Sequence, residues 1–243
     1  MLILNNSKDL KILAIIPARG GSKGIPGKNI KPLNGEPLLA YTVNSAKESK
    51  LLTRTILSSD DEDIIQVAKN LGLEVPFRRP SDLATDHAPT LPTIIHALNF
   101  FKKGGEEFDF VCLLQTTTPF RRKGLIDEAI TKILETGADA LVSVLPVPHE
   151  FNPHWIFESD QKGMLRIATG EKEIITRRQE LPTGYFRDGA IYLTKTSVLL
   201  EKSSLYGDNL AFVLGDLERY VNLDTPKDWA LAEELVTKLF TES

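Results

Sequence analysis

The chain has 243 residues, which is enough for one large domain or for one domain with an inserted segment. Hydrophobic residues make up 42% and charged residues 26%, which is ordinary for a globular protein and excludes a disordered or collagen-like chain. The formal net charge of -4 lacks the basic excess of duplex-binding proteins, so we expect no nucleic-acid partner.

The apolar runs of the chain are all shorter than the roughly 18 residues that a membrane span needs, so we expect no membrane association. The first residues are apolar, but they lack the basic region and the length of a signal peptide. A single cysteine, Cys112, lies in an apolar run, so no internal disulfide can form and a buried thiol is expected. Together these features favour a cytoplasmic protein.

Short apolar runs alternate with helical patterns along most of the chain. We predict strands at 11–17, 54–58, 108–114, 140–145 and 220–223, and helices at 37–48, 90–103, 123–135 and 226–239. Ser59, with Glu62 three residues later, is expected to cap a further helix that Gly72 ends. Thr225 is the expected N-cap of the last helix. Such alternation predicts an α/β fold with a mostly parallel sheet.

Residues 146–185 interrupt this alternation. They hold four prolines, a turn pattern at 160–163 and short β-like pieces at 155–157 and 164–167. We interpret the segment as an inserted antiparallel element; the alternative, a long irregular loop, is uncommon inside a compact domain.

A glycine-rich, basic segment at 16–31 follows the first predicted strand directly. Its four glycines let the backbone approach a ligand closely, and no acidic residue occurs from position 20 through 35. Four cations accompany the glycines: Arg19, Lys23, Lys28 and Lys31. Backbone amides and concentrated positive charge are typical of a phosphate-binding loop. The spacing is neither that of a Walker loop, where Ser22 replaces a required glycine, nor that of a dinucleotide fingerprint.

Residues 17–29 closely resemble the signature of sugar-activating nucleotidyltransferases, in particular the acylneuraminate cytidylyltransferase family. Further segments that resemble this family follow in order as far as about residue 234. The resemblance implies a Rossmann-like three-layer nucleotidyltransferase sheet forming a single domain over 1–243, with a small dimerisation arm at about 146–185. It also implies nucleotide contacts from the loop, at Ala18, Arg19, Gly20, Ser22 and Asn29.

The segment at 79–86 resembles the family's second motif, whose arginine and small downstream residues hold the cytidine. By position these are Arg79, Ala88 and Thr90. For Arg79 the residues alone leave a surface ion pair as an equal alternative.

The expected sugar contacts lie in two later segments. Gln115 ends a predicted strand, where ligands of open α/β sheets bind, and the family's glutamine at this place contacts the sugar. The segment at 177–192 resembles the family's sugar-side motif and supplies Arg178, Tyr185, Arg187 and Asp188. Arg178 and Arg187 are candidates for the sugar carboxylate, whereas Asp188 replaces the family's usual asparagine.

Residues 221–226 resemble the family's metal segment, usually Asp-x-Asp. Asn222 and Asp224 alternate along a predicted strand, so both could bind one Mg²⁺ (or Mn²⁺) ion. The alternative for Asp224 is that it only helps to cap the last helix.

The resemblance predicts transfer of CMP from CTP to an acidic nine-carbon keto-sugar such as N-acetylneuraminate, legionaminate or pseudaminate, with release of pyrophosphate. Arg19, Lys23, Lys28 and Asp224 are the expected catalytic residues, and a homodimer with shared sugar sites is the expected assembly. The alternatives are an eight-carbon sugar substrate and, because of Asn222 and Asp188, an inactive nucleotide-binding regulator.

Overall fold

The computed structural model describes residues 10–241, and the chain divides into two compact units. The larger unit runs to Ser143 and resumes at Asp188, and the smaller comprises Val144–Arg187. The smaller unit covers the inserted segment expected at 146–185. In the described part of the chain, no helix has both the length and the apolar character needed to cross a membrane.

The sheet of the larger unit has six strands in the order β10-β6-β9-β5-β1-β4. Their bounds are β1 (Ile12–Pro17), β4 (Arg54–Ser58), β5 (Phe110–Leu113), β6 (Ala140–Pro146), β9 (Tyr185–Lys195) and β10 (Leu210–Leu214). Strand β1 pairs in parallel with β4 and with β5, whereas β9 pairs antiparallel with β5. Strands β1 and β5 are apolar along their length because helices cover both of their faces.

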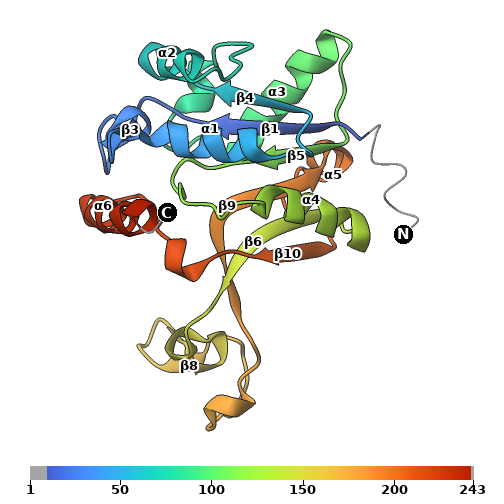
Figure 1. Ribbon diagram of the computed structural model, residues 1–243. Coiled ribbons are helices and arrows are strands. Elements are labelled where there is room, and N and C mark those ends of the chain that lie inside the picture. The colour runs from blue at the N-terminus through green and yellow to red at the C-terminus, as the bar shows by residue number, and fades with distance from the viewer. Residues whose placement is uncertain (1–9, 242–243) are drawn as a thin grey trace. The chain divides into compact units, whose positions relative to one another are not determined.

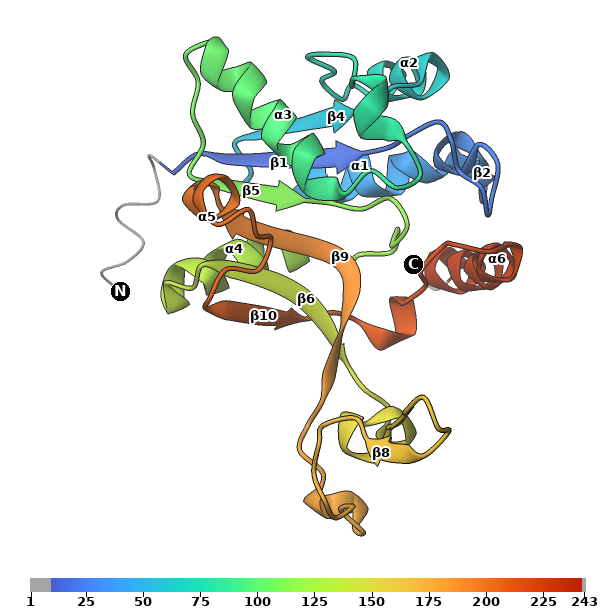
Figure 2. The same cartoon turned by 180° about the vertical axis from the view of Figure 1, so that it is seen from behind.

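Helices form the outer layers of the larger unit. They are α1 (Leu38–Glu48), α2 (Glu62–Asn70), α3 (Thr90–Lys103), α4 (Leu125–Thr136), α5 (Thr196–Glu201) and α6 (Pro226–Thr241). Helices α1 and α4 cover one face of the sheet, and α3 and α5 cover the other (Figures 1 and 2). Apolar side chains of α1 and α4, such as Val43 and Ile130, join those of the strands in one buried core. The predicted three-layer α/β fold is therefore confirmed.

Short elements complete the larger unit. The 3₁₀ helix η2 (Lys28–Ile30) lies within the phosphate loop, and the hairpin β2 (Pro32–Leu33) and β3 (Glu36–Pro37) follows it. Asn34 and Gly35 both have positive φ at the tip of this hairpin, as a type I′ turn requires. The segments η3 (Ser81–Ala84) and η7 (Leu217–Arg219) precede α3 and α6.

The smaller unit is built around a two-stranded antiparallel hairpin, as the sequence pattern predicted. Strands β7 (Phe157–Ser159) and β8 (Leu165–Ile167) pair across the turn that contains Gly163, whose φ is 77°. The unit also contains three 3₁₀ helices: η4 (His149–Phe151), η5 (Pro153–Trp155) and η6 (Arg178–Glu180). Trp155 packs into this unit and donates its indole N–H to the carbonyl of Ile175 at 2.6 Å.

Several local predictions were wrong. Asp61, not Ser59, caps α2, because its carboxylate accepts the backbone N–H of Ile64 at 3.0 Å. Residues 220–223 form no strand; this extended segment makes a backbone hydrogen bond at Leu223 to Thr117. The elements β9, α5 and β10 were not predicted. The continuous apolar run at 190–193, which lies buried inside β9, was not interpreted as a strand.

Candidate active site

A cavity of about 310 Å³ opens where β1 and β5 end, in the larger unit. Parallel strands bring their carboxyl ends to one edge of the sheet, which is why the loops after β1 and β5 meet here. Eight of the residues expected at the site line this cavity: Arg19, Ser22, Lys28, Asn29, Arg79, Ala88, Thr90 and Asp224. Thr93, Thr116 and Asp86 also line it, although none of them was assigned to the site from the sequence.

Asn29 holds the phosphate loop to the end of β5. Its side-chain N–H donates to the carbonyl of Arg19 at 3.0 Å, and its side-chain oxygen accepts the hydroxyl of Thr116 at 2.7 Å. Asn29 is buried, so both bonds are shielded from water. The loop is therefore a fixed element of the cavity wall, and Thr116 anchors it from the turn that follows β5.

Lys28 joins the phosphate loop to the segment before α6. Its ammonium donates to the carbonyl of Leu223 at 2.5 Å and lies 3.6 Å from a carboxylate oxygen of Asp224. Burial lowers the pKa of Lys28, and the nearby charge of Asp224 opposes this shift. Gly24 lies against the same segment: a Cβ at this position would be 2.0 Å from the carbonyl oxygen of Asp224.

The other assigned loop residues do not line the cavity. Ala18 is buried and donates its N–H to the carbonyl of Ser58, and Gly20 donates to the carboxylate of Asp60 at 3.3 Å. Lys23 is exposed, and Lys31 lies over the ring of Trp229 with its ammonium 4.2 Å from the ring centroid. Lys31, the fourth cation of the pattern, is therefore engaged outside the cavity.

Arg79 is buried, with 6% of its surface exposed, so the alternative of a surface ion pair is wrong. Its Nε donates to the hydroxyl of Ser58 at 3.0 Å, and its Nη2 donates to the Ser58 carbonyl at the end of β4. Burial lowers the pKa of Arg79 to about 10, with the charge of Asp60 acting in the opposite direction. A guanidinium held in this way presents a rigid polar wall to a ligand.

Asn222 and Asp224 converge, although the backbone between them is not a strand. The amide of Asn222 donates to a carboxylate oxygen of Asp224 at 2.7 Å. Helix α6 is capped by Thr225 and Asp228. The carboxylate of Asp228 accepts the hydroxyl and the backbone N–H of Thr225, and the Thr225 hydroxyl accepts the backbone N–H of Asp228. Asp224 joins this cap only through its backbone N–H, which Asp228 accepts at 3.1 Å, whereas its carboxylate contacts Asn222 and Lys28.

This pair of side chains fits a hard, oxygen-binding cation better than a soft one. It offers one carboxylate and one amide oxygen, and rotation of the amide would aim its oxygen at the ion. Among residues 10–241, no three or more His, Cys, Asp or Glu side chains gather as a metal site. A cation here would depend on water and phosphate oxygens for its remaining ligands, as Mg²⁺ often does.

Asp188 points into the protein interior. It is 4% exposed, and its carboxylate accepts the hydroxyl of Ser143 and the N–H of Ala190. Nearby, the buried guanidinium of Arg121 donates to the carbonyls of Ala190 and Gln115, at 2.9 and 2.5 Å. Burial lowers the pKa of Arg121 to about 10, and Cys112 and Asp188 oppose that shift. Gln115 and Asp188 both lie outside the lining of the cavity.

The remaining expected sugar residues belong to the smaller unit. Arg178 begins η6 and is exposed, whereas Tyr185 and Arg187 lie at the start of β9 and are also exposed.

A family model described as cytidylyltransferase matches residues 13–228, which is most of the chain. The chain belongs to the cytidylyltransferase family. The resemblance noted in the phosphate loop is thereby confirmed, and the protein is a nucleotidyltransferase.

Named relatives agree with this assignment. The chain is 36% identical over 228 residues to a CMP-N,N'-diacetyllegionaminic acid synthase of Legionella pneumophila, covering 93% of this chain and 97% of the relative. It is 31% identical over 230 residues to a pseudaminic acid cytidylyltransferase of Campylobacter jejuni, covering 93% and 96%. With N-acylneuraminate cytidylyltransferase A of Danio rerio the identity is also 31%, over 95% of this chain and 52% of that protein.

Solved structures share the fold at low sequence identity. A CMP:2-keto-3-deoxy-manno-octonic acid synthetase complexed with CTP superposes with a TM-score of 0.70 at 16% identity, covering 94% of this chain and 99% of that one. A 4-diphosphocytidyl-2C-methyl-D-erythritol synthase from Anaerococcus prevotii has a TM-score of 0.65 at 15% identity, covering 94% and 96%.

Proposed function

We propose that this cytidylyltransferase transfers CMP from CTP to the anomeric hydroxyl of an acidic nine-carbon keto-sugar and releases pyrophosphate. The observation that carries the proposal is the cavity itself: a glycine-rich loop, the cations Arg19 and Lys28, and the buried Arg79 line one space at the carboxyl ends of β1 and β5. The relatives named for legionaminic and pseudaminic acid match the chain along nearly its whole length, which favours a nine-carbon over an eight-carbon sugar.

In this reaction the sugar hydroxyl oxygen forms a bond to the α-phosphorus of CTP as the bond to the bridging α,β-oxygen breaks. The electron pair of that bond leaves with pyrophosphate, and the hydroxyl proton passes to solvent. Arg19, Lys23 and Lys28 neutralise the triphosphate and the leaving group, while Arg79, Ala88 and Thr90 orient the cytidine. Positioning and charge neutralisation supply the catalysis, so no covalent enzyme intermediate is needed.

Asn222 and Asp224 would hold Mg²⁺, or Mn²⁺ in its place, since their side-chain oxygens suit a hard cation. When bound, the ion would neutralise phosphate charge and lower the pKa of the attacking hydroxyl. The contact between Lys28 and Asp224 fixes these residues relative to the phosphate loop.

The sugar contacts proposed from the family resemblance are Gln115, Arg178, Tyr185 and Arg187. Arg178 and Arg187 each carry a guanidinium suited to bidentate binding of the sugar carboxylate. Asp188 is less well placed for this role because its carboxylate already accepts two hydrogen bonds in the interior.

We further infer a homodimer formed through the smaller unit, Val144–Arg187. Seven large apolar or aromatic side chains of this unit are exposed: Phe151, Ile156, Phe157, Met164, Leu165, Ile174 and Tyr185. So many exposed apolar side chains in a short segment are typical of a surface that another chain covers. Light scattering at working concentration is expected to show a dimer, and a purely monomeric protein would contradict the inference.

Pyrophosphate release from CTP tests the activity, with N-acetylneuraminate, legionaminate, pseudaminate and an eight-carbon keto-sugar as parallel substrates. We expect release that depends on both sugar and Mg²⁺, and highest with one of the nine-carbon acids. Highest release with the eight-carbon sugar would show that an eight-carbon keto-sugar is the substrate. Binding of CTP without release for any sugar would favour the inactive regulator.

A further inference from the structure

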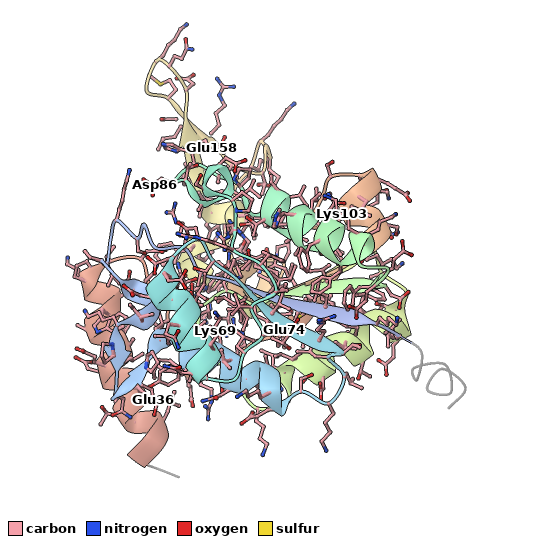
Figure 3. The ribbon with its side chains drawn as sticks, turned by 90° about the horizontal axis from the view of Figure 1, so that it is seen from above. Glu36, Lys69, Glu74, Asp86, Lys103 and Glu158 are labelled. Carbon is pink, nitrogen blue, oxygen red and sulfur yellow. The ribbon has the colours of Figure 1, made fainter. Side chains whose placement is uncertain are left out.

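Asp86 makes ion pairs with two cations of the phosphate loop. One carboxylate oxygen lies 3.0 Å from a guanidinium nitrogen of Arg19, and the other lies 2.6 Å from the ammonium of Lys23. Figure 3 labels Asp86 on the segment that precedes α3, beside the phosphate loop. These are the cations that the proposed function assigns to the triphosphate.

We propose that Asp86 is an internal competitor for the phosphate site: its carboxylate occupies the cations in the free protein, and the phosphates of a nucleotide must displace it. The inference rests on the proposed function, because it takes the β- and γ-phosphates of CTP as the groups that meet Arg19 and Lys23. Asp86 thereby sets the affinity of the protein for CTP and for pyrophosphate.

The position of the ion pairs distinguishes them from an ordinary surface contact. Asp86 lines the same cavity as Arg19, Lys28 and Asp224, and about 30% of the Asp86 and Arg19 side chains is exposed, whereas 78% of the Lys23 side chain is exposed. Each carboxylate oxygen meets a different cation, as two oxygens of one phosphate group would. Lys23 and Arg19 also hold the pKa of Asp86 below its usual value, so the competitor is negatively charged at neutral pH.

The carboxylate and a phosphate cannot share these cations without facing each other as like charges. Asp86 belongs to a short turn between η3 and α3, closed by a hydrogen bond from the N–H of Ala88 to the carbonyl of Thr85. Such a turn can move its carboxylate without unwinding α3, which begins at Thr90. Displacement therefore costs the two ion pairs and leaves the neighbouring helix intact.

The competition acts only on ligands that carry the outer phosphates. It should weaken the binding of CTP and of pyrophosphate, whereas cytidine, which has no phosphate, should bind independently of Asp86. Exposed ion pairs are screened by salt, so the effect should also decrease as ionic strength rises.

Calorimetric titration of wild type, Asp86→Asn and Asp82→Asn with CTP, pyrophosphate and cytidine, all in EDTA, tests the proposal. Asp82 is the matched control because it is an exposed aspartate in the same segment and lies outside the cavity lining. We expect Asp86→Asn to bind CTP and pyrophosphate about 2- to 30-fold more tightly at low salt, the range for losing two exposed ion pairs. Cytidine binding by Asp86→Asn, and binding of every ligand by Asp82→Asn, should match the wild type.

Unchanged or weaker binding of CTP and pyrophosphate by Asp86→Asn would overturn the proposal, as would an equal gain for cytidine. A gain that persists at high salt would also contradict it. If CTP binds neither the wild type nor the variant, and the wild type releases no pyrophosphate with sugar and Mg²⁺, the proposed function fails together with this inference. If the wild type binds CTP and Asp86→Asn binds it no better, only the inference fails.

Discussion

The ammonium of Lys28 lies 2.5 Å from the carbonyl oxygen of Leu223 and 3.6 Å from the carboxylate of Asp224. One buried cation thus joins the phosphate loop to the segment that carries the candidate metal ligands. Gly24 approaches the same segment so closely that no side chain fits between them. The geometry of the candidate active site therefore depends on contact between the two segments, and this contact can be tested at Gly24.

Gly24→Ala is expected to reduce turnover by about 10²-fold, the cost of displacing a reacting group by about 1 Å. The added Cβ would lie 2.0 Å from the backbone oxygen of Asp224, so the loop and this segment must separate. Gly21→Ala is the matched control, because a Cβ at position 21 meets nothing within 4 Å. Steady-state pyrophosphate release measures both variants. Equal activities would show that the approach at Gly24 does not position the site.

Arg19→Ala is expected to lower turnover by at least about 10²-fold, the usual effect of removing one preorganised electrostatic group. Its guanidinium lines the cavity and is assigned to the triphosphate. Lys69→Ala, which removes a cation from the exposed face of α2 (Figure 3), should leave turnover unchanged. Near-normal turnover of Arg19→Ala would exclude its catalytic assignment.

Asn222→Asp is expected to tighten Mg²⁺ binding several-fold, because a second carboxylate would face Asp224 across the proposed ion. Without a metal the two carboxylates repel each other, so the variant should melt at a lower temperature in EDTA and recover with Mg²⁺. Calorimetry and thermal melting measure the two effects. Asn70→Asp, on the exposed surface of α2, should show neither. A variant with unchanged Mg²⁺ affinity would exclude position 222 from the metal site.

Asp188→Asn is expected to lower the free energy of unfolding by about 1–3 kcal/mol, the scale for impairing a buried hydrogen-bonded group. The carboxylate accepts two hydrogen bonds, and its charge partly offsets the burial of Arg121. Urea unfolding measures the loss, with the exposed Asp82→Asn as control. The order of preference among sugars should stay the same. If Asp188→Asn changes the order of preference among sugars while its stability is unaltered, Asp188 belongs to the sugar site, as the sequence predicted.

Features that depend on local pattern could be predicted from the amino-acid sequence. Strands such as 54–58, the amphipathic helices and the inserted antiparallel element follow from hydrophobic spacing and from proline and glycine positions. The phosphate loop and its family were identifiable because glycines and cations recur at a specific spacing within 17–29. The capping of α6 by Thr225 likewise depends on residues only three positions apart.

Contacts between segments that are far apart in the chain could not be predicted and became visible in the folded structure. It directed Asp188 into the interior, brought Lys28 to Leu223, and placed Asp86 on Arg19 and Lys23. It also made β9 an antiparallel member of the sheet, beside β5. The sequence around a charged side chain does not indicate which residue it will pair with. Burial and pairing of charges depend on which loops the sheet brings to one edge. Hydrophobic periodicity within a segment does not specify which loops meet there.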